Sequence, residues 1–338
     1  KLIAQRELPV LLKAKKMWGG LILGDNLSEW AELGGIFSVL ENVESHIILL
    51  AKETLKHLDE VVNNLKELDG LCAEEMVEDL KSAKYGEHAS NLGGIIALEI
   101  SKRVGCPAYI ADPVVVDEMC DVARVGGHPM FPRLSIFHAL NHKAIAKLYA
   151  KEIGRDYNDL NLVVAHLGGG CSIAAHSKGK VVDVNNALMG DGPFSPERTG
   201  GISAMQLAKV CFSGEYTHEE IKKIISGKGG IVAHLGTNSF KDVDDMVAAG
   251  DPKATLISDA FVYNVAKAIG GMAAALSGNV DGIVVTGGIA YGKLIMQQLT
   301  DMVKFIAPVR IYPGEDEMGA LAKNALAVIE GKEEVKQY

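Results

Sequence analysis

Three short β-like segments joined by two glycine-containing turns lie between residues 160 and 185. Segments 160–165, 171–176 and 181–185 are rich in Val, Ile and Ala, and the sequences "LGGG" and "SKGK" connect them. Connections this short join antiparallel neighbours, so the region predicts an antiparallel meander of three strands.

Helical and strand patterns alternate after this meander. Helical patterns cover about 202–212, 218–226 and 253–276, and they are followed by a strand at 281–286, a helix after Gly292, a strand at 307–312 and a last helix through 327. The order β-β-β-α-β-α-β-α with inserted helices predicts a mixed α/β domain.

The sequence before the meander predicts mainly helices. Apolar residues at three-four spacing over 36–68 predict one long helix, which suits packing or oligomerisation rather than chemistry, and residues 1–75 read as largely helical. An apolar helix through Arg103 follows, and the stretch "CPAYIADPVVV" then predicts a buried strand that ends near Asp112.

Charge and cysteine content limit the function classes. The net charge of −9, from 43 acidic and 34 basic residues, gives no electrostatic footprint for nucleic acid or an anionic membrane. Five widely spaced cysteines without a CxxC pair indicate neither a disulfide framework nor a zinc site. No apolar run reaches membrane length and no signal peptide is recognisable, so a cytoplasmic location is expected.

Glycines follow two of the predicted strands. In "HLGGG" they allow close backbone approach and present N–H groups to an anion, although a structural hairpin would use the same residues. In "VVTGGIAYGKL" the spacing of Gly287, Gly292 and Lys293 matches a P-loop, but Leu294 occupies the position of the magnesium-binding hydroxyl. A close-approach turn at Gly287 and Gly288, on a strand-to-helix junction, is the preferred reading.

Four polar residues each have a functional and a structural reading. Arg198 in "PFSPERTGG" could reach phosphate oxygens from its loop, or be an ordinary surface arginine. His138 could be a helix cap, Asp112 could close a strand, and Glu317 could be a first-turn acid that favours the helix dipole.

Taken together, the motifs resemble the butyrate kinase branch of the acetate kinase family. The matching segments, in family order, are "GEHASNLG", "ADPVVVDEM", "ARVGGHP", "SIFHALN", "VVAHLGGGCSIAAHSKGKVVDVNNAL", "GDGPFSPERTG", "HLGT", "VVTGGIA" and "FIAPV". The resemblance implies an α/β fold of two actin-like (ribonuclease-H-like) domains with a cleft between them, placed at 1–157 and 158–338. It also implies ATP-dependent phosphorylation of a short-chain carboxylic acid, butyrate or a branched analogue, with Mg²⁺ and within a homodimer.

The same resemblance assigns roles to individual residues. Arg198 matches the arginine that contacts the transferring phosphoryl group, His138 the transition-state histidine, and Asp112 the aspartate that orients carboxylate and metal. Glu317 matches the magnesium-associated glutamate. The phosphate loop and the nucleotide site are carried over onto His166, Gly168, Gly169, Gly170, Gly236, Thr237, Gly287, Gly288 and Ile289.

The first 75 residues depart from the family pattern. The family opens with a strand and an Asn-x-Gly-Ser-type phosphate loop and later carries an Arg-Gly-Gly; neither is found here, and Trp18 precedes Gly19 and Gly20. An alternative hypothesis is therefore a non-catalytic nucleotide-binding or assembly protein on the same scaffold, which has lost the N-terminal phosphate loop.

Overall fold

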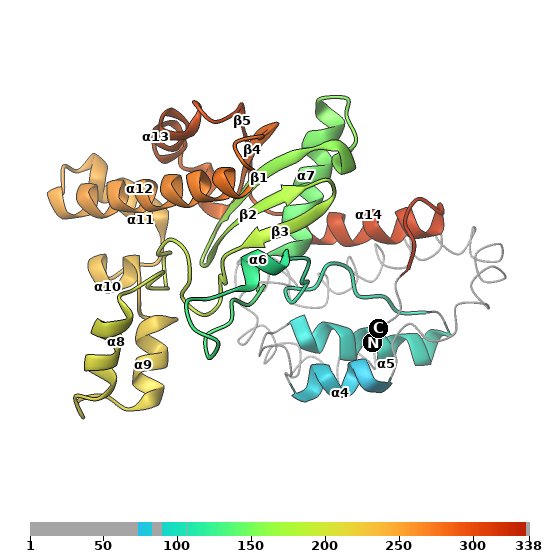
Figure 1. Cartoon of the computed structure of the whole chain (residues 1–338), viewed down its shortest axis with the longest axis horizontal. Coiled ribbons are helices and arrows are strands. Elements are labelled where there is room, and N and C mark those ends of the chain that lie inside the picture. The colour runs from blue at the N-terminus through green and yellow to red at the C-terminus, as the bar shows by residue number, and fades with distance from the viewer. Residues whose placement is uncertain (1–73, 83–89, 106, 336–338) are drawn as a thin grey trace, which may run out of the picture. The chain divides into compact units, whose positions relative to one another are not determined.

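The computed structural model describes residues 74–82, 90–105 and 107–335. The chain divides into two compact units, one of residues 110–328 and the other of residues 1–109 together with 329–338. The helices and strands (Figure 1) are α4 (Glu74–Ser82), α5 (Ser90–Val104), α6 (Asp121–Arg124), α7 (Ala139–Glu152), η1 (Tyr157–Asp159), β1 (Asn161–Leu167), β2 (Cys171–Ser177), β3 (Lys180–Val184), α8 (Ala204–Cys211), α9 (His218–Ile225), α10 (Ile231–Leu235), α11 (Phe240–Ala248), α12 (Pro252–Ala275), β4 (Gly282–Gly287), η2 (Gly288–Tyr291), α13 (Lys293–Val303), β5 (Val309–Pro313) and α14 (Glu317–Ile329).

The unit of residues 110–328 is built on a five-stranded sheet in the order β3-β2-β1-β4-β5. β1, β2 and β3 pair antiparallel, which confirms the predicted meander, whereas β4 and β5 are parallel to β1. In the parallel pair Val163 lies opposite Ile283 and His166 opposite Thr286. The carboxyl ends of β1 and β4 therefore meet at one edge of the sheet, where both glycine segments begin.

Alternate residues along β1 point to opposite faces of the sheet and pack against different helices. Val163, Ala165 and Leu167 belong to a core with side chains of α12 and α13, whereas Leu162 and Val164 pack with side chains of α7. Figure 1 shows the same arrangement, with α7 on one face of the sheet and α12 on the other. β1 is buried on both faces, which explains why its sequence is a nearly continuous apolar run.

The helices after the meander lie close to their predicted positions. The long helix expected at 253–276 is α12, whose start is defined by Asp251, because its carboxylate accepts hydrogen bonds from the Lys253 and Ala254 amides. Pro252 at the first helical position also favours this start. The helices expected near 202–212 and 218–226 are α8 and α9.

The strand predicted to end near Asp112 is not formed, since residues 107–120 contain no strand. Pro107 and Pro113 lack the N–H groups that a sheet ladder requires. Asp112 also takes the left-handed conformation, with φ 42°, which interrupts an extended backbone. The apolar residues of this stretch led to a wrong prediction because strand formation also needs a free partner edge.

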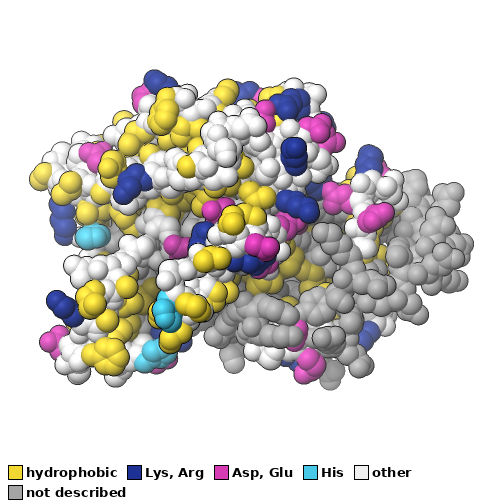
Figure 2. Space-filling view, viewed as in Figure 1, with side chains coloured by type: hydrophobic (Ala, Val, Ile, Leu, Met, Phe, Trp, Pro, Cys, Tyr) yellow, Lys and Arg dark blue, Asp and Glu magenta, His cyan; other side chains and the backbone are white. Residues whose placement is uncertain are grey.

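The other unit contains α4 and α5, which pack against each other, and α5 confirms the apolar helix predicted through Arg103. The long helix expected at 36–68, and most of the helical reading of 1–75, lie outside the described residues. Among the helices of the described ranges, none is both long enough and apolar enough to cross a bilayer. On the face drawn in Figure 2, basic side chains are interspersed with acidic ones.

Candidate active site

The glycine loop of residues 168–170 connects β1 to β2 and is held in a tight turn. The Gly168 amide donates to the Gly170 carbonyl at 3.2 Å, and the Ser195 hydroxyl donates to the Gly169 carbonyl at 2.6 Å. A side chain on Gly169 would meet no atom within 4 Å, so this part of the loop faces open space. The geometry suits a loop that accepts a ligand on its exposed side.

Arg198 lies directly over this loop. A Cβ atom added to Gly170 would overlap the Arg198 guanidinium, so the absence of a side chain there leaves room for the arginine. The guanidinium is partly buried, and this desolvation lowers the pKa of Arg198 from its ordinary value. Arg198 Nε donates a long hydrogen bond to the Ser226 hydroxyl, at 3.4 Å.

Arg198 differs from the other arginines in the described ranges. Each of those forms an ion pair with a carboxylate, whereas no carboxylate of the described chain lies within ion-pair distance of Arg198. The ion pairs are Arg103–Glu99, Arg124–Asp117, Arg133–Asp183, Arg155–Asp281 and Arg310–Glu152. Glu197 acts on Arg198 only at longer range, so the guanidinium is a partly buried cation without an ion pair in the described chain, which suits it to bind an anion.

Two histidines stack beside the loop. The rings of His138 and His166 are 3.8 Å apart between centroids and nearly parallel, at 11°. His166 Nδ1 lies 3.0 Å from the Asn141 side-chain oxygen, and Nε2 lies 3.7 Å from a carboxylate oxygen of Glu315. Burial and the neighbouring His138 lower the pKa of His166 well below its ordinary value, so the contact with Glu315 is not an ion pair at neutral pH.

Acidic residues gather at the start of α14. Asp316 caps the helix, because its carboxylate accepts from the Gly319 amide at 2.9 Å. Glu315 and Glu317 lie two residues apart in the sequence, and burial, followed by repulsion from Glu317, raises the pKa of Glu315. Neither forms an ion pair with a lysine or arginine in the described chain. No cluster of three or more metal-ligating side chains occurs there, so a cation at this point would draw most of its ligands from elsewhere.

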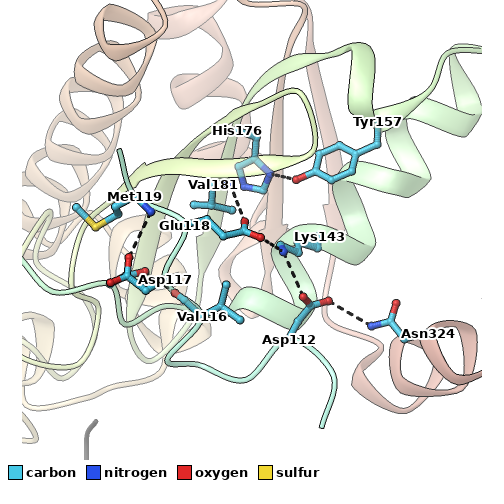
Figure 3. A network of polar contacts seen from close by, with 11 residues as sticks. Asp112, Val116, Asp117, Glu118, Met119, Lys143, Tyr157, His176, Val181 and Asn324 are labelled. Carbon is cyan, nitrogen blue, oxygen red and sulfur yellow. Dashed lines mark hydrogen bonds and ion pairs between the residues drawn. The ribbon is translucent and has the colours of Figure 1, made fainter. Parts of the chain in front are cut away.

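Asp112 lies in a separate polar network. Its carboxylate is 3.3 Å from the Lys143 ammonium and accepts from the Asn324 amide at 3.3 Å, as Figure 3 shows. Lys143 also pairs with Glu118 at 2.8 Å, and the two carboxylates raise the pKa of Lys143 despite its burial. Asn324 stands on α14, two helical turns beyond Glu317, or about 10 Å along the axis.

The segment predicted to hold nucleotide at Gly236 and Thr237 follows α10. Gly236 takes the left-handed conformation, with φ 77° and open space at its Cβ position. Thr237 donates its hydroxyl to Asp242 at 2.7 Å, and the next residue, Asn238, donates to the Glu197 carboxylate at 2.6 Å. The segment is thus tied to the loop that carries Arg198.

The second predicted nucleotide segment follows β4. Gly287 has φ 93°, and a Cβ there would overlap the Leu167 backbone, so only glycine lets the two strand ends approach. Gly288 faces open space, whereas Ile289 is buried in the core. Gly287 and Gly288 therefore form the close-approach turn that was preferred over a P-loop.

Several polar residues beside the site were not expected from the sequence. Ser172 and His176 on β2 and His142 on α7 are fully buried, and Tyr157 is nearly so. The signal was a pair of polar residues four positions apart in each segment, 138 and 142 at the start of α7 and 172 and 176 on β2. Such spacing puts each pair on one face of its element.

Comparisons with known proteins identify the family of this chain. The sequence profile of the Acetokinase family matches residues 133–307. The chain is 58% identical over 265 residues to Butyrate kinase 2 of Clostridium acetobutylicum, covering 78% of this chain and 74% of that protein. The chain belongs to the acetokinase family.

Two further relatives of this acetokinase-family chain extend the comparison. Butyrate kinase 1 of Clostridium acetobutylicum is 55% identical over 265 residues, which cover 78% of this chain and 75% of that protein. The crystal structure of Porphyromonas gingivalis acetate kinase has a similar fold, with a TM-score of 0.67 at 20% identity over 76% of this chain and 73% of that one. The resemblance stated from the sequence motifs is confirmed.

Proposed function

We propose that this chain transfers the γ-phosphoryl group of ATP to the carboxylate of a short-chain acid, butyrate or a branched analogue, to form an acyl phosphate. The relatives named butyrate kinases support the substrate class. The observation that carries the proposal for the site is Arg198, a partly buried arginine without a carboxylate partner in the described chain, which lies against the glycine loop.

Catalysis of this reaction requires mainly positive charge near the phosphoryl group and correct positioning of the reactants. A carboxylate is a competent nucleophile at neutral pH, so no strong general base is needed. Arg198 would neutralise charge on the transferring phosphoryl group, and the amides of Gly169 and Gly170 with His138 would donate hydrogen bonds to its oxygens. His166, whose neutral ring donates from Nδ1 to the Asn141 oxygen, would line the phosphate loop beside Gly168. Gly236, Thr237, Gly287, Gly288 and Ile289 are proposed to border the nucleotide.

The carboxylates of Glu315 and Glu317 fit a magnesium ion. They flank Asp316 at the start of α14 and have no lysine or arginine partner among the described residues, and Mg²⁺ binds few protein carboxylates beside phosphate oxygens and water. The bound ion would offset charge on the phosphate oxygens. Replacing Glu317 by Gln should raise the Mg²⁺ concentration that gives half-maximal rate; an unchanged requirement would exclude Glu317 from the metal site.

Asp112 is proposed to orient the substrate carboxylate and the metal. Its contacts with Lys143 and Asn324 hold the carboxylate in place.

We further propose that residues 1–157 and 158–338 are two actin-like domains, the first atypical in its N-terminal part, and that the protein is a cytoplasmic homodimer. The exposed apolar side chains Leu256 and Tyr263 of α12 offer a surface for a second copy, which light scattering would test.

The function is tested by trapping the product. Protein incubated with ATP, Mg²⁺, butyrate and hydroxylamine should form an acyl hydroxamate, and failure with every short-chain acid would refute the proposal. Arg198→Ala should lower kcat by about 10³-fold or more. The matched control is Arg155→Ala, because Arg155 pairs with Asp281 at the opposite end of the sheet, and it should retain near wild-type kcat.

A non-catalytic nucleotide-binding protein predicts a different pattern. ATP would then bind in calorimetry to both the wild type and Arg198→Ala, and neither would form hydroxamate. The family membership and the unpaired charge of Arg198 favour the kinase.

A further inference from the structure

A continuous series of hydrogen bonds runs from a buried tyrosine to His138. His138 Nδ1 and His142 Nε2 each lie 2.8 Å from the Ser172 hydroxyl oxygen, His142 Nδ1 lies 3.3 Å from His176 Nε2, and His176 Nδ1 lies 2.9 Å from the Tyr157 hydroxyl. We call these five side chains the histidine relay. Figure 3 shows its far end, where Tyr157 meets His176.

The relay lies between α7 and β2 and is closed to water over most of its length. Ser172, His142 and His176 are fully buried and Tyr157 is 7% exposed, whereas His138 is half-buried. Burial lowers the pKa of His142 well below its ordinary value and that of His176 to about 3. Both rings are therefore neutral at neutral pH.

A neutral imidazole has one N–H donor and one lone-pair acceptor. Because His142 and His176 use both ring nitrogens inside the relay, each donates on one side and accepts on the other. The donors must therefore point in one common direction, either toward His138 or toward Tyr157.

Tyr157 selects the direction. The recorded partner of its hydroxyl within the described chain is His176 alone. If His176 donated to the phenol oxygen, the phenol O–H would be left buried without an acceptor, which is unfavourable. The phenol therefore donates to His176 Nδ1, His176 to His142, and His142 to Ser172. The Ser172 O–H, which has no other recorded partner in these ranges, then donates to His138 Nδ1.

We propose that Tyr157, acting through the histidine relay, holds His138 as the Nε2–H tautomer, so that its ring presents a donor rather than a lone pair to the transferring phosphoryl group. The inference rests on the proposed function for the role of His138. Tyr157, His176, His142 and Ser172 are positioning residues, since they act through His138. In the other tautomer, the Nε2 lone pair of His138 would face the phosphoryl oxygens. Their repulsion would destabilise the transition state.

The tautomer can be observed directly. Long-range ¹H–¹⁵N correlation spectra of histidine-labelled protein distinguish protonated from unprotonated ring nitrogens, and loss of one set of signals in His138→Asn assigns His138. The wild type should show Nε2–H at His138, and the conservative Tyr157→Phe should show both tautomers. Wild-type protein in the Nδ1–H form, or a Tyr157→Phe spectrum identical to wild type, would overturn the proposal.

A matched control is Tyr149→Phe. Tyr149 packs in the same core cluster as Tyr157, is 6% exposed, and donates to the Asp281 carbonyl outside the relay. This variant should leave the His138 spectrum and kcat unchanged, although it also removes a buried phenol hydroxyl. A tautomer change in Tyr149→Phe would refute the specific role of Tyr157.

Kinetics give a second readout. If Tyr157→Phe leaves the two directions equally populated, half the molecules carry the wrong tautomer, and kcat falls about 2-fold with unchanged KM. Ser172→Ala removes the last donor of the relay and should also mix the His138 tautomers.

If the wild type forms no acyl phosphate but shows the expected spectra, the proposed function fails and the relay stands. If it is active but the spectra do not respond, the relay fails alone.

Discussion

A single methyl group added at Gly170 tests whether Arg198 acts at the glycine loop. The Cβ of Gly170→Ala would overlap Arg198 Nη1, and the carbonyl oxygen of Ala187 would lie 3.2 Å from it on another side. To regain an ordinary carbon contact distance of about 3.5 Å, the guanidinium must move by about 2 Å. The substitution therefore displaces the proposed phosphoryl-binding cation without removing any functional group.

The expected loss follows from this displacement. A misplacement of about 1 Å can reduce a rate about 10²-fold, so Gly170→Ala should lower kcat by at least about 10²-fold, or roughly 2.7 kcal/mol in activation free energy. The guanidinium is the flexible end of its side chain, so the free energy of unfolding should change little. The assay is hydroxamate formation at saturating ATP and butyrate, beside urea unfolding of the same samples.

Gly271→Ala provides the control. Gly271 lies on α12, outside the glycine loop, and its Cβ would meet no atom within 4 Å, so the Arg198 position is unaffected. Its kcat should equal that of the wild type. The reasoning is refuted if Gly170→Ala retains wild-type kcat, or if both variants lose activity equally.

Two further predictions concern stability. His142, His166 and His176 have pKa values depressed by burial, that of His176 to about 3, so below pH 6.5 the unfolded chain binds protons that the folded chain does not. His176 should reduce the free energy of unfolding by about 1.4 kcal/mol per pH unit between pH 6 and 4, and His142 and His166 should add to this loss in the same direction. Urea titrations at several pH values would detect a falling midpoint; a flat profile would contradict the neutral burial of these rings. Gly287→Ala should destabilise by about 2 kcal/mol or more, because φ is 93° and Leu167 blocks the Cβ, whereas Gly288→Ala, which faces open space, should stay within about 0.5 kcal/mol. Equal unfolding midpoints for these two variants would refute the close-approach argument.

The predicted meander was accurate because its signals are local. The β1 and β2 regions are apolar runs ended by glycine turns, and their observed bounds, Asn161–Leu167 and Cys171–Ser177, lie within two residues of those predicted. The stretch before Asp112 has an equally apolar pattern but forms no strand. Whether an apolar segment pairs depends on a neighbouring edge and on backbone N–H groups, and Pro107 and Pro113 have none to donate.

The site was predictable only in part. Family-like motifs pointed to His138, to the 168–170 loop and to Arg198, and the structure places these residues beside one another. The pairing of Asp112 with Lys143 was not expected, nor was the contact of Glu315 with His166. Their contacts join elements far apart in sequence, and no local pattern encodes them.

The sequence by itself determined the α/β order of the C-terminal half and the glycine turns, because periodicity and turn chemistry act over a few residues. Its motifs, by their resemblance to a known family, also indicated the acetokinase family. Only the tertiary structure decided which arginine lacks a counter-charge and which way the histidine relay points. Both depend on every neighbouring donor, acceptor and charge. The packing of α7 against the sheet, and of Arg198 against the glycine loop, supplies those neighbours from distant parts of the chain.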